Sequence, residues 1–219
     1  RYPILPGSKV SEYNQILNLP ISGAAAYFAR IIKAKTGGKS LAGMEIHAYL
    51  NIFKNNGTIF LNRLLRTPEI DFLGGPPSYD ERSLGNYAIE RAALTSLQKH
   101  GKFWFSEEDI RPHTAYGMPG GAAGEPPATR EDSLNVIRRQ FAAGMLKGYP
   151  GYLMDFGINW FHDVYIARTV QACNNIFEVL TRQGKLNRKC RIALVSDQES
   201  QLYGNYFANP TLIRQKVFS

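Results

Sequence analysis

The sequence has no long hydrophobic run and little cysteine, and both absences limit what the chain can be. No window of about 18 apolar residues occurs, so we predict no segment that spans a membrane and no membrane partner. The two cysteines, Cys173 and Cys190, are too few for a disulfide scaffold. We expect both to be free thiols, which is consistent with a reducing compartment and favours the cytoplasm. Secretion stays an alternative, because the chain begins with Arg1 and a targeting signal could lie upstream.

Motifs that bind phosphates or metals are also missing. Neither GxGxxG nor GxxxxGK[ST] follows any apolar run, which disfavours nucleotide binding. Only four histidines occur, and none belongs to an HxH or HExxH pair, so the ligand count disfavours a metal site. We therefore predict a protein without a metal or cofactor.

Clustered charge of one sign is lacking as well, although the formal net charge is +8. Such an excess indicates nucleic-acid binding when the basic residues form a patch. Here they are scattered, and the densest run is KLNRKCR at residues 185–191. We interpret the charge as that of an ordinary basic surface and predict no nucleic-acid partner. Nucleic-acid association stays an alternative that depends on the charge alone.

The chain instead contains two kinds of apolar segment that alternate. Segments with helical spacing are each followed by a short apolar run that closes in a loop or at polar residues. The predicted helices are residues 22–39, 58–68, 83–101, 129–148 and 163–184, and the predicted strands lie in residues 40–50, 69–77, 102–110, 151–160 and 190–200. Ser22 and Ser83 are predicted N-caps. This alternation predicts an α/β fold with a parallel sheet and right-handed crossovers.

Two architectures fit this order, a (β/α) barrel and an open doubly wound sheet. Polar and acidic residues gather where successive strands are predicted to end. They are Glu45 and His47, then Tyr79 and Arg82, then Glu107 to Asp109, then Asp155 and Trp160. Active sites of (β/α)8 barrels lie at the C-terminal ends of the strands, so this distribution favours the barrel.

The segment GKFWFSEEDIRPH, residues 101–113, ends an aromatic strand in three consecutive acids. Alternate side chains of a strand share a face, so Glu107 and Glu108 are predicted to lie on opposite faces and to differ in role. A glutamate beside Arg111 and His113 is a candidate nucleophile, because a neighbouring cation keeps it ionised. Glycosidases use two carboxyl groups, one as proton donor and one as nucleophile or stabiliser. The alternative is a structural carboxylate paired with Arg111.

Several segments resemble barrel glycoside hydrolases related to the family 42 β-galactosidases, in the large retaining clan with TIM-type barrels. GKFWFSEEDIRPH resembles their acidic strand segment, and PEIDFLGGPPSYDER (68–82) resembles the segment that comes before it. VIRRQFAAGMLKGYPGYLMDFGINWFHD (136–163) and KAKTGGKSLAG (33–43) resemble two further segments, in the expected order. CRIALVSDQES (190–200) resembles the first strand of the flavodoxin-like domain that follows such barrels.

The resemblance implies a retaining β-glycosidase, most similar to β-galactosidases, with a carbohydrate substrate. The nucleophile of the clan is a glutamate at the end of the seventh strand. The matching residue is Glu107, with Glu108 as its rival one position away. The residues predicted to support the nucleophile or to bind substrate are Asp109, Arg111, His113, Tyr79, Arg82, Asp155, Trp160 and Glu45.

The chain departs from the clan in one respect. The general acid of the clan lies at the end of the fourth strand, and no matching Asn-Glu pair precedes residue 40. We therefore expect residues 1–185 to form strands five to eight of the barrel, and residues 186–219 to begin the flavodoxin-like domain. Because the chain begins with Arg1 rather than Met, we expect the other half of the barrel to lie upstream in the same protein or on another chain. Whether the protein forms a homo-oligomer is left open by the sequence. The alternative is a non-catalytic carbohydrate-binding or assembly protein derived from such a barrel.

Overall fold

The computed structural model divides the chain into two compact units. The first contains residues 1–74, 92–103 and 192–219, and the second contains residues 75–91 and 104–191. The described residues are 6–46, 60–79, 82–86, 90–115, 126–155, 157, 159–184, 195, 197 and 199–203.

By their hydrogen-bonded pairing, the four strands form one parallel sheet. The strands are β1 (Gly43–Glu45), β2 (Phe72–Gly75), β3 (Phe103–Glu108) and β4 (Gly151–Leu153), and their order in the sheet is their order along the chain. The helices are α1 (Lys9–Thr36), α2 (Leu61–Arg66), α3 (Leu94–Lys99), α4 (Arg130–Lys147) and α5 (Val164–Gln183). Since a helix lies between each strand and the next, the predicted α/β fold with a parallel sheet is confirmed.

Helix α1 begins well before its predicted start. Its N-cap is Ser8, whose hydroxyl oxygen accepts a hydrogen bond from Ser11 N at 3.3 Å. The prediction of Ser22 as the N-cap was wrong, because Ser22 lies inside the helix and its hydroxyl donates to the carbonyl of Leu19. Pro20 explains the error: proline lacks the N–H that a helix interior needs and usually ends a helix, yet α1 continues through it.

The inner face of α1 is small and polar, whereas its outer face is apolar. Its buried residues are Ser11, Asn14, Asn18, Ser22, Ala26 and Ala29. Asn14 Nδ2 donates to the carbonyl of Leu202 at 3.1 Å, which joins α1 to the short 3-10 helix η3 (Glu199–Tyr203). Ile16 and Phe28, in contrast, are 69% and 60% exposed. Small side chains let α1 approach α2, β1 and η3 closely, which reverses the usual amphipathic pattern.

A buried lysine connects the start of β3 to the turn that follows α2. Lys102 Nζ donates to the carbonyl oxygens of Thr67 at 2.7 Å and Ile70 at 2.5 Å. Burial lowers the pKa of Lys102, although the charges of Asp71 and Glu69 oppose that shift. The ammonium group therefore holds the turn between α2 and β2 through two of its main-chain carbonyl oxygens.

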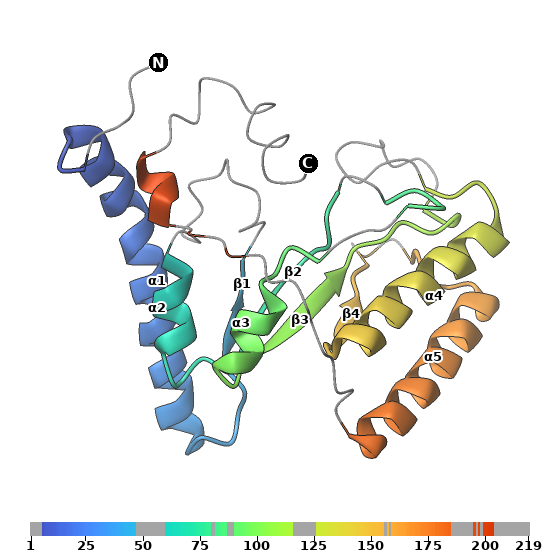
Figure 1. Ribbon diagram of the computed structural model, residues 1–219. Helices are drawn as coiled ribbons and strands as arrows, with labels where there is room; N and C mark the ends of the chain where they lie inside the picture. The colour runs from blue at the N-terminus through green and yellow to red at the C-terminus, as the bar shows by residue number, and fades with distance from the viewer. Residues whose placement is uncertain are drawn as a thin grey trace. The chain divides into compact units, whose positions relative to one another are not determined.

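Helices α4 and α5 of the second unit begin at side-chain caps. Thr129 Oγ1 accepts a hydrogen bond from Asp132 N at 3.1 Å, and Asp163 Oδ1 accepts one from Tyr165 N at 2.7 Å. Such caps satisfy main-chain amides at the start of a helix. Figure 1 shows the two helices packed side by side, and their contact is built on the buried side chains of Leu134, Ile137 and Ile166. Both helices lie within their predicted segments.

Only the last part of the predicted helix 83–101 is helical, as α3. Its predicted N-cap, Ser83, lies in a turn instead. The guanidinium group of Arg139, from α4, donates to the carbonyl oxygens of Ser83 at 2.9 Å and Asn86 at 2.6 Å. Those carbonyl groups would accept intrahelical bonds in a helix, so the contact with α4 replaces the predicted first turn. Residues 87–89 lie outside the described residues.

Most of the predicted C-terminal segment also lies outside the described residues. The strand expected within residues 190–200 and the flavodoxin-like start expected at residues 186–219 therefore lie mostly outside the described residues, as does Cys190. His47, near the end of the strand predicted at residues 40–50, is also outside them. Cys173, which is described, is a buried free cysteine. In the described part of the chain, no helix combines the length and apolar character needed to cross a bilayer.

Candidate functional site

Four buried polar residues form the C-terminal end of β3 and the position after it. Ser106 is 1% exposed, and Glu107, Glu108 and Asp109 are each 6% exposed. Carboxylates are almost never buried this far unless they are paired, because removing a charge from water is costly. The partners of these groups therefore decide what the strand end can do.

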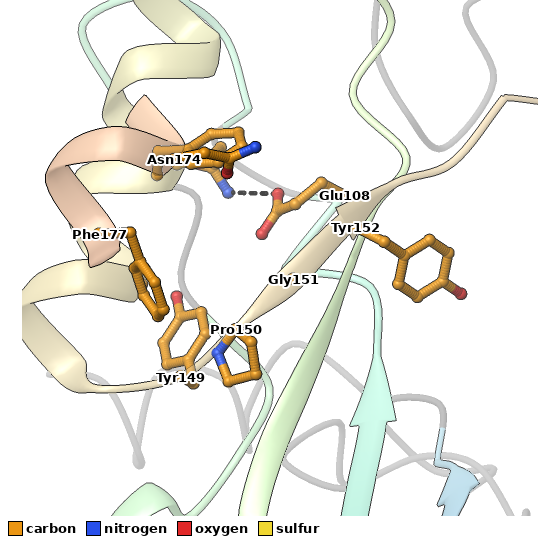
Figure 2. A pocket seen from close by; sticks show the side chains of 10 residues that line it. Glu108, Tyr149, Pro150, Gly151, Tyr152, Asn174 and Phe177 are labelled. Atoms are coloured by element: carbon orange, nitrogen blue, oxygen red, sulfur yellow. Dashed lines mark hydrogen bonds between the residues drawn. The ribbon is translucent and has the colours of Figure 1, made fainter. Parts of the chain in front are cut away.

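Glu108 faces the helix layer. Its Oε1 accepts a hydrogen bond from Ser106 Oγ at 2.6 Å, and its Oε2 accepts one from Gln140 Nε2 of α4 at 3.0 Å (Figure 2). Burial raises the pKa of Glu108, and the two hydrogen bonds oppose that shift without cancelling it. The carboxyl group is therefore held between the sheet and α4.

Glu107 lies on the other face of the strand, as the alternation predicts. In the parallel ladder Glu107 is in register with Tyr152 of β4. The Tyr152 ring packs on Phe105, with ring centroids 5.1 Å apart, and Figure 2 shows this ring directed away from Glu108. Phe105, Glu107 and Tyr152 thus share the face opposite α4, and the two glutamates have different surroundings.

Asp109, Arg82 and Tyr79 are brought together beside this strand end. Arg82 Nη2 lies 2.6 Å from Asp109 Oδ1, and the guanidinium group also donates to the carbonyl oxygens of Pro77 and Ser78, each at 2.9 Å. The guanidinium carbon of Arg82 is 4.1 Å from the centroid of the Tyr79 ring. Burial and the charge of Asp109 raise the pKa of Tyr79, so its phenol stays protonated at neutral pH. Three residues predicted to support the site therefore form one cluster.

Two further residues of this network, Arg139 and Gln140, were not predicted. Gln140 holds Glu108, and its side-chain oxygen accepts a hydrogen bond from Arg139 Nε at 3.1 Å. Arg139 also donates to the carbonyl oxygen of Arg82 at 3.1 Å, so it links the loop before α3 to α4. A signal for Gln140 exists in the sequence, because it shares the buried face of α4 with Val136 and Gly144 at helical spacing.

His113, predicted to support Glu107, contacts the helix starts. Its main-chain N donates to Ser133 Oγ at 2.7 Å, and its Nε2 lies 3.4 Å from Asp163 Oδ2. Asp163 also accepts a hydrogen bond from Arg130 Nε at 2.8 Å, which lowers the pKa of Asp163. These contacts join the first turns of α4 and α5, so they give His113 a structural role there.

The other residues predicted for the site differ in burial and in the contacts described for them; they are Asp155, Trp160, Arg111 and Glu45. Asp155 Oδ2 accepts a hydrogen bond from Trp160 N at 2.9 Å. Trp160 is 1% exposed and meets Phe161 edge to face, so in this arrangement its ring is packed and would have to be uncovered to stack on a sugar. Arg111 is half-buried, and Glu45 is an exposed residue of β1 in the first unit.

Among the described residues, no group of three or more His, Cys, Asp or Glu side chains is arranged to hold a metal ion. No family model, curated protein or solved structure matches the chain. The resemblance to glycoside hydrolases therefore stays a prediction.

Proposed function

We propose that this chain is part of a retaining β-glycosidase of the β-galactosidase type, with Glu107 as its nucleophile. The general acid would be supplied by residues outside this chain segment, and the substrate is a β-linked carbohydrate. The observation that carries the proposal is the position of Glu107, a buried carboxylate at the C-terminal end of a parallel strand on the face opposite α4.

The strand order supports a barrel segment. Four parallel strands follow one another in chain order, whereas doubly wound sheets reverse their order at the point where ligands bind. In a (β/α)8 barrel the helices cover the outside, so a side chain on the face opposite its helices points inward. Catalytic residues of such barrels lie at the C-terminal strand ends, which is where Glu107 is.

The surroundings of the two glutamates favour Glu107 over Glu108. Glu108 is held by Ser106 and Gln140 on the helix side, and burial raises its pKa, which favours the neutral form and opposes attack. Asp109 and Arg82 hold the loop that follows Glu107 through their buried ion pair. In the proposed reaction Glu107 attacks the anomeric carbon, the glycosidic oxygen leaves with a proton from the general acid, and water later releases the sugar.

An activated substrate tests the nucleophile without the general acid. A 2,4-dinitrophenyl β-galactoside needs little proton donation to its leaving group, so the chain should release dinitrophenol and become covalently galactosylated. We expect Glu107→Gln to lower this release by at least about a thousandfold, as removal of nucleophiles does in other enzymes. Glu108→Gln is the matched control and should retain the covalent adduct.

Peptide mass mapping of a 2-deoxy-2-fluoro-galactosyl adduct locates the reacting residue. A label on Glu107 supports the proposal, and a label on Glu108 or no label at all contradicts it. The alternative, a non-catalytic carbohydrate-binding protein, is favoured by the structural use of Asp109, Arg82 and Glu108. Calorimetric binding of galactosides without any turnover would support that alternative.

A further inference from the structure

A second candidate site lies on the helix side of β3 and β4, within the second unit. A cavity of about 180 Å³ separates β3 and β4 from α4 and α5 (Figure 2). It is lined by Glu108, Gln140, Phe141, Gly144, Tyr149, Pro150, Gly151, Tyr152, Asn174 and Phe177. Asn174 is exposed, so solvent reaches the rim of the cavity. Glu107, the nucleophile proposed above, is not one of these residues.

The cavity combines one buried carboxyl group with aromatic walls. Figure 2 shows the carboxyl group of Glu108 and the hydroxyl group of Tyr149 directed into the space beside the Phe177 ring. Burial together with the charges of Glu90 and Glu108 raises the pKa of Tyr149, so its phenol is neutral. Each carboxyl oxygen of Glu108 accepts one hydrogen bond from a protein side chain, and a carboxylate oxygen has a second lone pair that can accept another.

We propose that this cavity binds a small organic ammonium ion made of a single ring with a short aminoalkyl group. A cavity of about 150 Å³ is large enough for one benzene ring, so 180 Å³ accommodates a ring and a short side chain. The ammonium group would donate to Glu108 and Tyr149, while the ring would lie against Phe141 and Phe177. Attraction between a cation and aromatic faces adds to this binding.

The nearby charges are compatible with a bound cation. Arg82 is paired with Asp109, and Lys147 is paired with Glu90 at 2.5 Å. Arg139 directs its guanidinium group to three main-chain carbonyl oxygens and to Gln140. Glu108 is the acidic residue among those that line the cavity. The charges of Arg82 and Arg139 act on it and favour its ionised form, and a cation placed beside it would favour that form further.

Benzylamine and benzyl alcohol are the probes, since they differ in charge but hardly in shape. Calorimetric titration of the whole chain at pH 7 should show benzylamine binding at least about tenfold more tightly, because hydrogen bonds to charged groups are the stronger ones. Glu108→Gln should weaken benzylamine by about ten- to a hundredfold and change benzyl alcohol by less than about threefold. Equal binding of both probes, or no binding of benzylamine, overturns the proposal.

A second pair of variants locates the site and does not depend on Glu108. Asn174→Trp fills the rim of the cavity from an exposed position of α5, so we expect it to weaken both probes. Asn175→Trp is the matched control, because Asn175 is exposed on the same helix and does not line the cavity. Benzylamine binding that is unchanged in Asn174→Trp places the ligand elsewhere and overturns the proposal. The test is independent of the glycosidase proposal, since neither variant involves Glu107.

Discussion

Arg82 Nη2 lies 2.6 Å from Asp109 Oδ1, with both side chains only 7% exposed. This ion pair joins the loop after β2 to the end of β3, the strand that carries the three acids. Because the guanidinium group also binds main-chain carbonyl oxygens, it neutralises a charge and closes a loop at the same time. Buried pairs of this kind are sensitive to the loss of one partner.

Removal of one partner of this pair should strongly destabilise the fold. We expect Asp109→Asn or Arg82→Met to lower the free energy of unfolding by about 3–5 kcal/mol, since each leaves a buried charge without its partner. Urea denaturation measures the change. The matched control is Arg182→Ala, which removes the largely exposed pair with Glu178 and should cost less than about 1 kcal/mol. Equal effects of the buried and exposed pairs would contradict this assignment.

Asp71 should stabilise the first unit against acid. Partial burial by itself raises its pKa, but hydrogen bonds from Lys33 and from Ala42 N and the charges of Lys33 and Lys102 outweigh this, so its pKa lies below the ordinary 3.8. A lowered pKa contributes stability above the unfolded value that is lost as pH falls through the folded value. We expect Asp71→Asn to be less stable than the parent at pH 6 and to approach it below pH 3.8. A difference that is constant with pH would refute the linkage.

Glu108 should show the opposite dependence. Burial raises its pKa above the ordinary 4.5, so its folded form binds a proton more tightly than the unfolded chain does. The stability from this protonation is complete below pH 4.5 and is lost as pH rises through the folded pKa. The stability of Glu108→Gln relative to the parent should therefore increase as pH rises from 4.5, measured as the difference between their unfolding free energies. A decrease over that range would mean that the pKa is lowered.

The two faces of α1 should respond differently to substitution. Ile16→Lys, on the exposed face, should change the free energy of unfolding by less than about 0.5 kcal/mol. Ala29→Leu, on the buried face, should cost about 1–3 kcal/mol, because a larger side chain separates α1 from the elements it packs on. Thermal unfolding monitored by circular dichroism compares them. If Ile16→Lys were the more damaging, the outer face would have to be a packed one.

Much of the local structure could be predicted because its causes are local. The aromatic run and its alternation predicted β3 and the opposite faces of Glu107 and Glu108, and helix-end signals placed α4 and α5. The errors have non-local causes. The start of the predicted helix 83–101 is instead a turn whose carbonyl groups bind Arg139, more than fifty residues away in the chain. Pro20 predicts the end of a helix from its own chemistry, because it has no N–H to donate, yet α1 continues through it.

The sequence by itself determined the alternation of helices with strands, the parallel character of the sheet, and the position of three acids at the end of β3. Only the tertiary structure decided what each acid does, since their partners come from distant segments. Gln140 reaches Glu108 from α4, and Arg82 reaches Asp109 from the loop after β2. The physical reason is that a buried carboxylate takes its charge state from the donors and cations around it, and chain folding alone brings those groups together.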